Sequence, residues 1–421
     1  MDKKIINGLV AEYENGRFNA VQKDIYVIGG KISFSGDDSQ CEVIDAKNRL
    51  IMPGLINMHT HAYMCLFRNY ADDVSFDEWL FRRIMPVEDV IEREDAYWMN
   101  MLGMIEMIES GTTCFSDMHM FEGQSCKAAK EAGLRAYIGR GLVGDDIGGD
   151  GAGRIGEMLR EKAEYESDTI KFIVSPHAIY SCSEKLLSQV AELAAKEGLL
   201  KQTHLSESVK EVEDCYEKHG ISPVELLDRA GFLEDSILAH CAQVSESDID
   251  LIRRRNATVV TNPASNAKLG NGIAPIKAIR EKGVNISIGT DGCSSNNTLN
   301  MFREMSLLSL MHKGVERDCT FLSANDVLTM ATVNAAKALH REGSLGIIAE
   351  GACADLIFLD LTASSLFPNN DVITALCYSA NGSEVASVMV NGRLLMKDRE
   401  LLTIDRERVY SEVGRLAKKY L

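Results

Sequence analysis

Two histidines separated by one residue are the first side chains in the sequence that could do chemistry together. They are His59 and His61, which end the short run Leu55–Met58. In a β-strand, residues i and i+2 point to the same face, so both imidazoles could hold one metal ion. The pattern H-x-H alone does not separate such a site from two exposed loop histidines. The remaining ligands therefore have to come from elsewhere in the chain.

Further residues of metal-binding or proton-transfer type follow other strand-like segments. They are His177, His204, His240 and Asp291. A catalytic zinc binds histidine nitrogen and carboxylate oxygen and keeps one position open for water. The set that fits this pattern consists of three histidines and one aspartate: His59, His61, His204 and Asp291.

The same segments suggest the proton-transfer residues and the number of metal ions. Glu207 follows His204 by three residues and is the best candidate for a proton shuttle. His240 and Asp291 could orient the attacking water, and Asp291 could also take its proton. A second metal ion would need a bridging ligand at the end of the fourth strand, which ends in His177. We therefore expect one metal ion.

The elements that must position these residues alternate between strand and helix patterns. Helical periodicity is seen in 95–109, 184–197, 206–218 and 245–256, the last two beginning at serine caps. Eight strand-then-helix units predict a (β/α)8 TIM barrel, whose active site lies at the carboxyl ends of its strands. A Rossmann-type sheet usually has six strands and a phosphate loop. The predicted strands are 55–61, 112–118, 134–141, 170–177, 199–205, 236–241, 258–263 and 285–291.

Both ends of the chain have a different, β-rich pattern. Residues 1–50 contain short strands separated by turns, and 355–360 and 385–390 are strand-like. Asn391-Gly392 is typical of a type I′ hairpin turn. We predict a small β-sandwich domain built from both termini, residues 1–52 and 350–421, beside a catalytic barrel of residues 53–349. Two unrelated flanking hairpins are the alternative.

Composition limits the class of protein. The chain has 421 residues, 45% of them hydrophobic and 25% charged, which is typical of a globular protein. A net charge of -17 argues against nucleic-acid binding. No segment has the roughly 18 apolar residues of a membrane span. Eleven cysteines without C-x-x-C pairs are typical of reduced thiols, so we expect a cytoplasmic protein.

Several spaced motifs together resemble one enzyme group. They are MPGLINMHTHAYM, SFDEWL, GTTCFSDM, SPHAIYSCS, THLSES, LAHC, NPASNAKLGNGIAP and GTDGCSSNNTLNMFREM. With these motifs, nearly the whole chain resembles the amidohydrolase superfamily. Within it, the chain is similar to the 5-methylthioadenosine/S-adenosylhomocysteine deaminases, in the branch that also holds triazine chlorohydrolases and guanine deaminases.

The resemblance implies residue roles. It places the metal ligands on the four residues named above, the H-x-x-E glutamate on Glu207 and the strand-six histidine on His240. The family's ribose-binding glutamate matches Glu88. An arginine that meets a homocysteine carboxylate in some members would be Arg154, although the glycine-rich loop before it can be aligned in more than one way. The other substrate-binding residues implied are Arg140, His177 and Trp79.

The resemblance also implies a reaction. The adenine ring of an adenosine-type nucleoside would be deaminated hydrolytically to the inosine analogue and ammonia, with Glu207 protonating ring N1. Candidate substrates are S-adenosylhomocysteine, 5′-methylthioadenosine, 5′-deoxyadenosine and adenosine, and the 5′ substituent stays open. One divalent metal per subunit is expected, zinc first, with Fe²⁺ or Mn²⁺ as alternatives. A homo-oligomer is expected. Guanine deamination or triazine hydrolysis is the alternative reaction.

Overall fold

The computed structural model describes residues 2–148 and 150–421. Its centre is an eight-stranded sheet in which neighbouring strands follow one another in sequence and run parallel. Each of the eight predicted strands is present, with ends that differ by at most three residues. The strands are β8 (Leu55–Thr60), β9 (Thr112–His119), β10 (Arg135–Leu142), β11 (Ile170–Pro176), β12 (Leu200–Leu205), β13 (Ser236–His240), β14 (Thr258–Thr261) and β15 (Asn285–Ile288).

The sheet closes because the loop after β15 returns to β8. The backbone N–H of Asp291 donates to the carbonyl of His59 at 2.9 Å. The side chain of Asn57 accepts from the N–H of Thr290 at 3.0 Å and donates to its hydroxyl at 2.7 Å. These bonds join the first and last strands at the carboxyl-terminal rim, which confirms the predicted (β/α)8 barrel.

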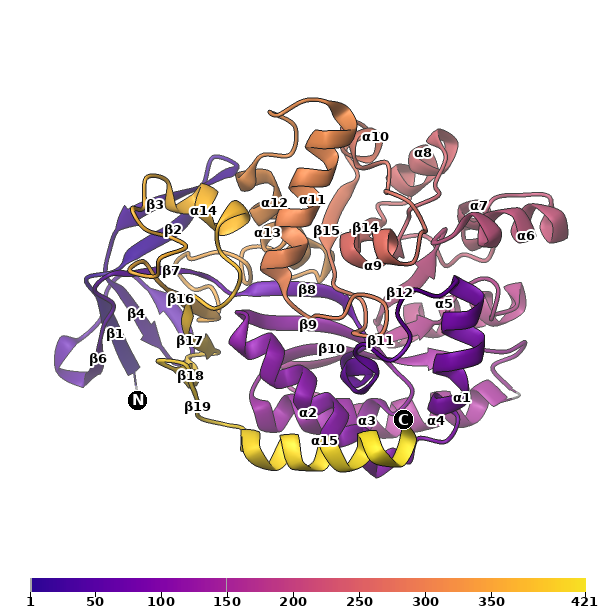
Figure 1. The fold of residues 1–421 in the computed structure, drawn as a ribbon, viewed down its shortest axis with the longest axis horizontal. Coiled ribbons are helices and arrows are strands. Elements are labelled where there is room, and N and C mark those ends of the chain that lie inside the picture. Colours follow the sequence, from indigo (N-terminus) through magenta and orange to yellow (C-terminus); the bar gives the residue numbers. More distant parts are fainter. Residues whose placement is uncertain (1, 149) are drawn as a thin grey trace.

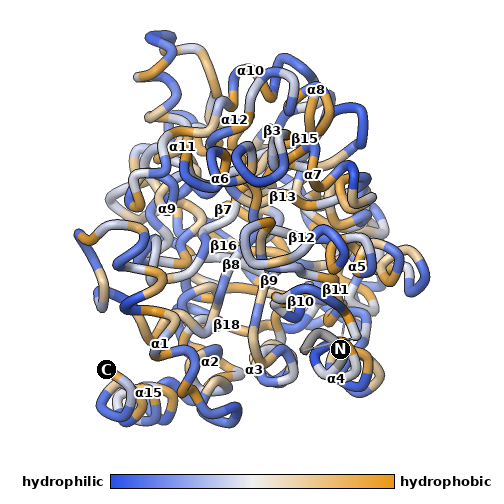
Figure 2. Tube along the Cα trace, turned by 90° about the vertical axis from the view of Figure 1, so that its right-hand side faces the viewer, coloured by the Kyte–Doolittle hydropathy of each residue, from blue (hydrophilic) through white to orange (hydrophobic). Residues whose placement is uncertain are grey.

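Helices cover the outside of the barrel (Figure 1), and in the view of Figure 2 they combine hydrophilic and hydrophobic stretches around the central strands. This amphipathic pattern is typical of helices that pack one face on a sheet. They are α2 (Arg93–Glu109), α3 (Glu122–Ala132), α4 (Asp150–Tyr165), α5 (Glu184–Glu197), α6 (Val209–His219), α7 (Pro223–Arg229), α8 (Glu246–Arg254), α10 (Ile276–Glu281), α11 (Met301–Glu316), α12 (Ala324–Met330) and α13 (Val333–Ala338). The short helix α9 (Pro263–Lys268) follows β14 and contacts Asp291 and His240 at the rim.

One predicted helix start is wrong. We expected a helix from Ser206, but α6 begins at Val209, and it is the hydroxyl of Ser208 that accepts the N–H of Glu211 as the cap. The Glu211 carboxylate reaches back and accepts the N–H groups of Ser206 and Glu207 at 2.9 and 2.8 Å. These two residues are therefore held outside the helix. As a result, Glu207 stands at the barrel rim and does not enter the first helical turn.

Two β-sheets at one end of the molecule combine both termini (Figure 1). Apolar side chains such as Ile5, Ile51 and Met389 fill the space between them, which gives the expected sandwich. Asn391 and Gly392 have φ of 49° and 77°, as a type I′ turn requires. One sheet contains β5 (Lys31–Ser33), β4 (Ile25–Ile28), β1 (Asp2–Ile6) and β6 (Cys41–Asp45); the other contains β19 (Glu400–Leu401), β18 (Arg393–Lys397), β17 (Val385–Val390), β16 (Leu356–Asp360), β7 (Arg49–Pro53), β2 (Leu9–Glu14) and β3 (Arg17–Gln22).

The C-terminal helix leaves the terminal sheets and returns to the barrel. Helix α15 (Arg406–Tyr420) lies beside α2, at the lower edge of Figure 1. Asp95 of α2 accepts from Arg415 at 3.2 Å, and from Lys419 and Tyr420 at 2.8 Å each. The remaining helix of the C-terminal part, α14 (Val372–Tyr378), packs near α12. We propose that the two domains are the β-sandwich of residues 1–52 and 350–421 and the barrel of residues 53–349.

The rim of the barrel next to β8 carries three short helical segments. They are the 3₁₀ helix η2 (Ala62–Phe67), the π-helical segment η3 (Glu78–Ile84) and α1 (Met85–Glu88). A further 3₁₀ turn, η1 (Asp38–Gln40), lies in the terminal sheets. π-Helical turns often occur at functional sites.

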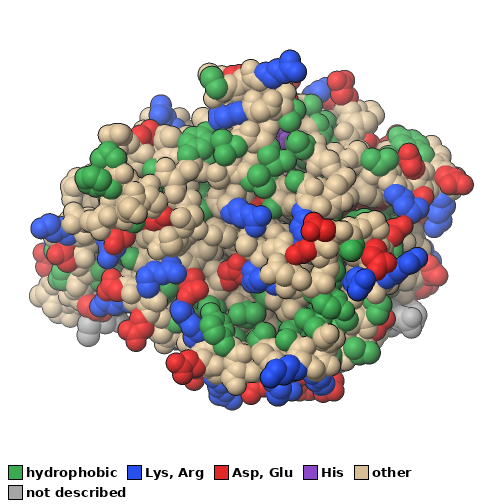
Figure 3. Space-filling view, viewed as in Figure 1, with side chains coloured by type: hydrophobic (Ala, Val, Ile, Leu, Met, Phe, Trp, Pro, Cys, Tyr) green, Lys and Arg blue, Asp and Glu red, His purple; other side chains and the backbone are tan. Residues whose placement is uncertain are grey.

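The surface is mixed in charge. Lys and Arg side chains alternate with Asp and Glu over the face shown in Figure 3. Among the described residues, every helix is too short or too polar to cross a membrane. All eleven cysteines are free thiols.

Candidate metal centre and substrate pocket

The Nε2 atoms of His61 and His204 face each other. The Nδ1–H of His61 donates to the carbonyl of Met118 at 2.8 Å, and that of His204 donates to the carbonyl of His177 at 2.6 Å. In the neutral rings the two Nε2 atoms are then lone-pair acceptors. They lie only 3.2 Å apart.

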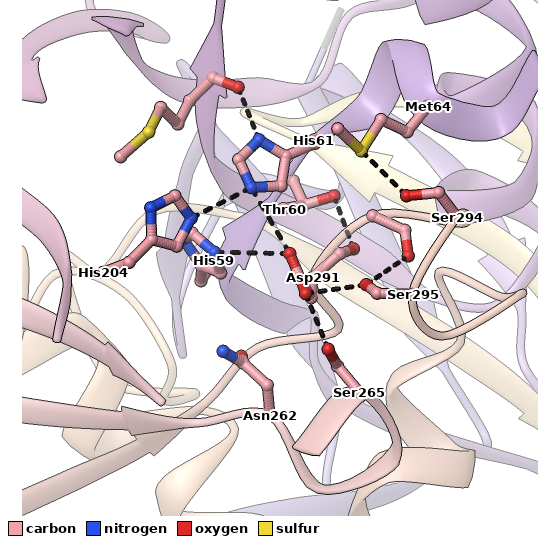
Figure 4. Close-up of polar contacts among 12 residues, drawn as sticks. His59, Thr60, His61, Met64, His204, Asn262, Ser265, Asp291, Ser294 and Ser295 are labelled. Atoms are coloured by element: carbon pink, nitrogen blue, oxygen red, sulfur yellow. Dashed lines mark hydrogen bonds and ion pairs between the residues drawn. The ribbon is translucent and has the colours of Figure 1, made fainter. Parts of the chain in front are cut away.

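His59 and Asp291 complete this group (Figure 4). The Oδ1 of Asp291 lies 3.5 Å from the Nε2 of His59 and 3.3 Å from that of His61. The ring nitrogens of His59 are buried without a hydrogen-bond partner in the described part of the chain. Burial raises the pKa of Asp291, but the facing His59 and His61 outweigh it and hold that pKa well below its usual range.

The four side chains fit a divalent cation. One atom from each of His59, His61, His204 and Asp291 lies within 4.8 Å of all the others, and all four residues are buried. Nitrogen and oxygen ligand atoms buried this close to one another are well placed to share a cation. Three imidazoles and one carboxylate are ligands that zinc and similar divalent ions bind. The structure thus brings together the set predicted from the sequence as a divalent-metal centre.

Two serines hold Asp291 from its other side (Figure 4). The hydroxyls of Ser265 and Ser295 each donate to its Oδ2 at 2.7 Å, which leaves Oδ1 directed to the histidines. Such hydrogen bonds orient a ligand and tune its affinity for the ion. Neither serine was predicted from the sequence. The only available signal was their position in the motifs NPASN and GTDGCSS.

The predicted proton-transfer residues stand next to this centre. Glu207 Oε2 lies 3.9 Å from the Nε2 of His240, and its Oε1 accepts from Asn271 at 3.0 Å. Burial raises the pKa of Glu207, although the nearby His240 opposes the shift. The Nδ1 of His240 lies 2.9 Å from the Oδ1 of Asn266. The structure therefore places a carboxyl group with a raised pKa beside a ring that a neighbouring amide orients.

A pocket opens over the centre and encloses about 1090 Å³, its mouth included. The predicted substrate residues Trp79, Glu88, Arg140, Arg154 and His177 all line it. Burial lowers the pKa of His177 to about 4, so its ring is neutral. The indole N–H of Trp79 is buried without a partner among the described residues. The pocket thus joins the metal centre to the substrate residues expected from the resemblance.

The two arginines of the pocket differ in their partners. Arg140 Nη2 lies 3.5 Å from the carboxylate of Glu157, which also binds Arg93. The Nε of Arg140 is buried and has no partner among the described residues. Arg154 donates to the carbonyl of Gly141 at 3.4 Å and forms no ion pair in the described chain. Of the two, Arg154 is therefore the cation less engaged by the protein itself.

The fold and these residues can be compared with known proteins. The family model described as "Amidohydrolase family" matches residues 50–395, which is most of the chain. The chain belongs to the amidohydrolase family. The matched region includes every residue of the metal centre and all of the pocket residues described above.

Similar proteins carry related names. A 5-methylthioadenosine/S-adenosylhomocysteine deaminase of Acetivibrio thermocellus is 42% identical over 381 residues, covering 90% of this chain and 88% of its own. A 5′-deoxyadenosine deaminase of Methanosarcina mazei is 40% identical over 407 residues, covering 95% and 94%. The zinc-bound structure of an adenosine deaminase from Xanthomonas campestris has a TM-score of 0.94 at 30% identity, covering 100% of this chain and 98% of its own.

Proposed function

We propose that this amidohydrolase is a metal-dependent deaminase of adenosine-type nucleosides, which releases ammonia and leaves the inosine analogue. The observation that carries the proposal is the buried metal centre, with Glu207 beside it, at the base of a pocket lined by Glu88 and two arginines. The deaminase names of similar proteins support it. Candidate substrates are S-adenosylhomocysteine, 5′-methylthioadenosine, 5′-deoxyadenosine and adenosine.

His59, His61, His204 and Asp291 would hold the ion, which we propose to be zinc because of the three imidazoles. When bound, such an ion lowers the pKa of water and polarises the substrate. His240 and the carboxylate of Asp291 would orient the attacking water toward C6 of the adenine ring. Their fixed positions, one against Asn266 and the other between two serines, suit this role.

Glu207 would move the protons. A buried carboxyl with a raised pKa can carry a proton near neutral pH and release it in the reaction. Glu207 would protonate ring N1 as C6 becomes tetrahedral. The attacking water would supply two protons, one passing through Glu207 to the departing amino group and the other restoring the Glu207 acid. The hydrogen bond from Asn271 keeps its carboxyl group in place for these transfers.

The pocket residues would bind the nucleoside. Glu88 would accept hydrogen bonds from the ribose hydroxyls, and Trp79 would form a wall of the pocket. Arg140, Arg154 and His177 would contact the base and the 5′ substituent. Arg154, as the less engaged cation, would meet an anionic 5′ tail such as a homocysteine carboxylate.

A substrate panel tests the proposal. Ammonia release would be followed with adenosine, 5′-deoxyadenosine, 5′-methylthioadenosine, S-adenosylhomocysteine, guanine and a chlorotriazine, and metal content would be measured on the same sample. We expect turnover of the adenosine-type compounds only, with a stoichiometric divalent metal. Turnover of guanine or the triazine in their place would overturn the proposal.

The variant Glu88→Ala separates nucleoside deamination from the reactions of guanine or a triazine. A ribose needs a hydrogen-bond acceptor, whereas a flat heterocycle does not, so kcat/KM for nucleosides should fall by at least about tenfold. Asp89→Ala is the matched control, because Asp89 is the next residue, is exposed and lies outside the pocket. Unchanged nucleoside kinetics in Glu88→Ala would favour a free base or a triazine.

Metal identity, assembly and location are also proposals. Zinc over iron or manganese can be tested by metal analysis of the protein purified without added metal. A homo-oligomer, expected from the resemblance, can be tested by sedimentation. We propose a cytoplasmic location, consistent with eleven free thiols.

A further inference from the structure

Tyr63 forms a short hydrogen bond with the proposed ribose-binding carboxylate. Its hydroxyl donates to Glu88 Oε1 at 2.5 Å, and both residues line the pocket. In the described chain, this phenol is the one side-chain partner of the Glu88 carboxylate. The other oxygen, Oε2, is left for a ligand. Tyr63 lies two residues after His61, so this contact also joins the ribose region to the metal centre.

The ring of Tyr63 is fixed by its surroundings. It packs edge-on against His119, with ring centroids 4.4 Å apart, and is 5% exposed. His119 is itself held by the N–H of Phe121, which donates to its Nδ1 at 2.7 Å, and by the side-chain amide of Asn100, 2.9 Å from its Nε2. These contacts hold the ring, and with it the phenol oxygen, beside Glu88.

A carboxylate that binds two neighbouring hydroxyls by itself would offer one oxygen to each. Here Oε1 already accepts the phenol, so a ribose would find one carboxylate oxygen without a protein donor. The phenol donates its O–H to Glu88, and its oxygen still has lone pairs that can accept a hydrogen bond. Two acceptors of different kinds therefore lie next to each other on the pocket wall.

We propose that Tyr63 and Glu88 bind the two ribose hydroxyls as a pair, one hydroxyl donating to Glu88 Oε2 and the other to the phenol oxygen of Tyr63. Tyr63 then becomes a specificity-determining residue that favours ribonucleosides over deoxynucleosides. This proposal rests on the function proposed above and names one more residue of the same site.

The test compares Tyr63→Phe with the wild type on adenosine, 2′-deoxyadenosine and 3′-deoxyadenosine. Loss of one hydrogen bond should raise KM for adenosine about tenfold, with kcat changed by less than about twofold. The same rise should occur with one deoxynucleoside. It should vanish with the other, because that substrate lacks the hydroxyl that Tyr63 binds.

Two results would overturn the proposal. An equal rise in KM on all three substrates would mean that Tyr63 only positions Glu88. No rise on adenosine would mean that the phenol has no role in binding. Tyr97→Phe is the matched control, since its hydroxyl also donates to a glutamate, Glu131, at 2.5 Å but outside the pocket. Its KM values should equal those of the wild type.

Calorimetry separates this proposal from the proposed function. Binding of inosine and of its 2′-deoxy and 3′-deoxy forms would be measured on wild type and Tyr63→Phe without turnover. If the wild type deaminates no nucleoside, the proposed function fails, yet the ratios of dissociation constants still test the pair. If the dissociation constant of Tyr63→Phe divided by that of the wild type is the same for all three ligands, the Tyr63 assignment is wrong, even where deamination is seen.

Discussion

The backbone N–H of Asp291 donates to the carbonyl of His59 over 2.9 Å, and this bond joins the loop after the last barrel strand to the first strand. The same contact places the Asp291 carboxylate 3.5 Å from the imidazole of His59. The contact that closes the barrel therefore also brings Asp291 to the metal centre. Changes that separate these two segments should affect stability and metal binding together.

Gly289→Ala should show this coupling. An added Cβ would lie 2.8 Å from the backbone nitrogen and Cβ of His59 and 2.6 Å from the side chain of Asn262, so the loop has to shift. We expect a loss of about 1–3 kcal/mol in unfolding free energy and a lower metal content. Calorimetry and metal analysis measure both. Gly314→Ala is the control: an added Cβ at this position of α11 meets no atom within 4 Å, so the change should be neutral or stabilising. Normal metal content in Gly289→Ala would contradict the coupling.

The serines that hold Asp291 should control metal affinity. Ser265→Ala or Ser295→Ala removes a donor at 2.7 Å from Oδ2, and each should weaken metal binding by about 10–100-fold. Competition with a chelator gives the affinities. Ser309→Ala, in α11, removes an equally short bond from a buried hydroxyl to the carbonyl of Leu322 and should leave the affinity unchanged. Equal effects in all three variants would show a general loss of stability.

Glu207→Gln should separate metal binding from turnover. The amide keeps the size of the carboxyl but cannot carry the proton, so kcat should fall by about 10²–10⁴-fold while the metal stays bound. Steady-state kinetics and metal analysis on one sample give both values. Glu213→Gln, at an exposed position of α6, is the control and should retain full activity. If Glu207→Gln turns over at the wild-type rate, Glu207 does not carry the proton.

Glu304 should make stability depend on pH. Burial raises the pKa of its carboxyl from 4.5 to about 7, although the N–H of Ala264 and the amide of Asn296 oppose the shift. Between these values the folded protein binds more protons than the unfolded chain, so this group's contribution to stability falls as pH rises and levels off above about 7.

The variant Glu304→Gln does not titrate, so its Tm should fall less than that of the wild type between about pH 5 and pH 8. Both proteins should be measured free of metal, because metal binding itself depends on pH. Parallel Tm curves for the two proteins would show that Glu304 does not carry this dependence.

Local patterns were sufficient for much of the fold. Strand-like runs lying between segments of helical periodicity located the eight strands, because both patterns are properties of each segment alone. The start of α6 was predicted wrongly, because Ser206 and Ser208 are both acceptable caps. The choice depends on the Glu211 carboxylate, which binds the two N–H groups before the helix.

Contacts between loops could not be predicted in this way. The spacing of the residues predicts neither the hydrogen bond from Ser265 to Asp291 nor that from Tyr63 to Glu88. Both depend on how the loops of different strands meet at the rim. Glu88 was expected in the pocket from the resemblance, but its partner was not.

By itself, the sequence determined which side chains stand at the carboxyl ends of the strands, and hence that His59, His61, His204 and Asp291 are of the right types for one divalent ion. Their convergence within 4.8 Å was decided by the closure of the barrel. The orientation of each ligand was also decided there, through the carbonyls of Met118 and His177. The physical reason is that residue type and strand period are local properties, whereas these distances depend on packing between segments far apart in the chain.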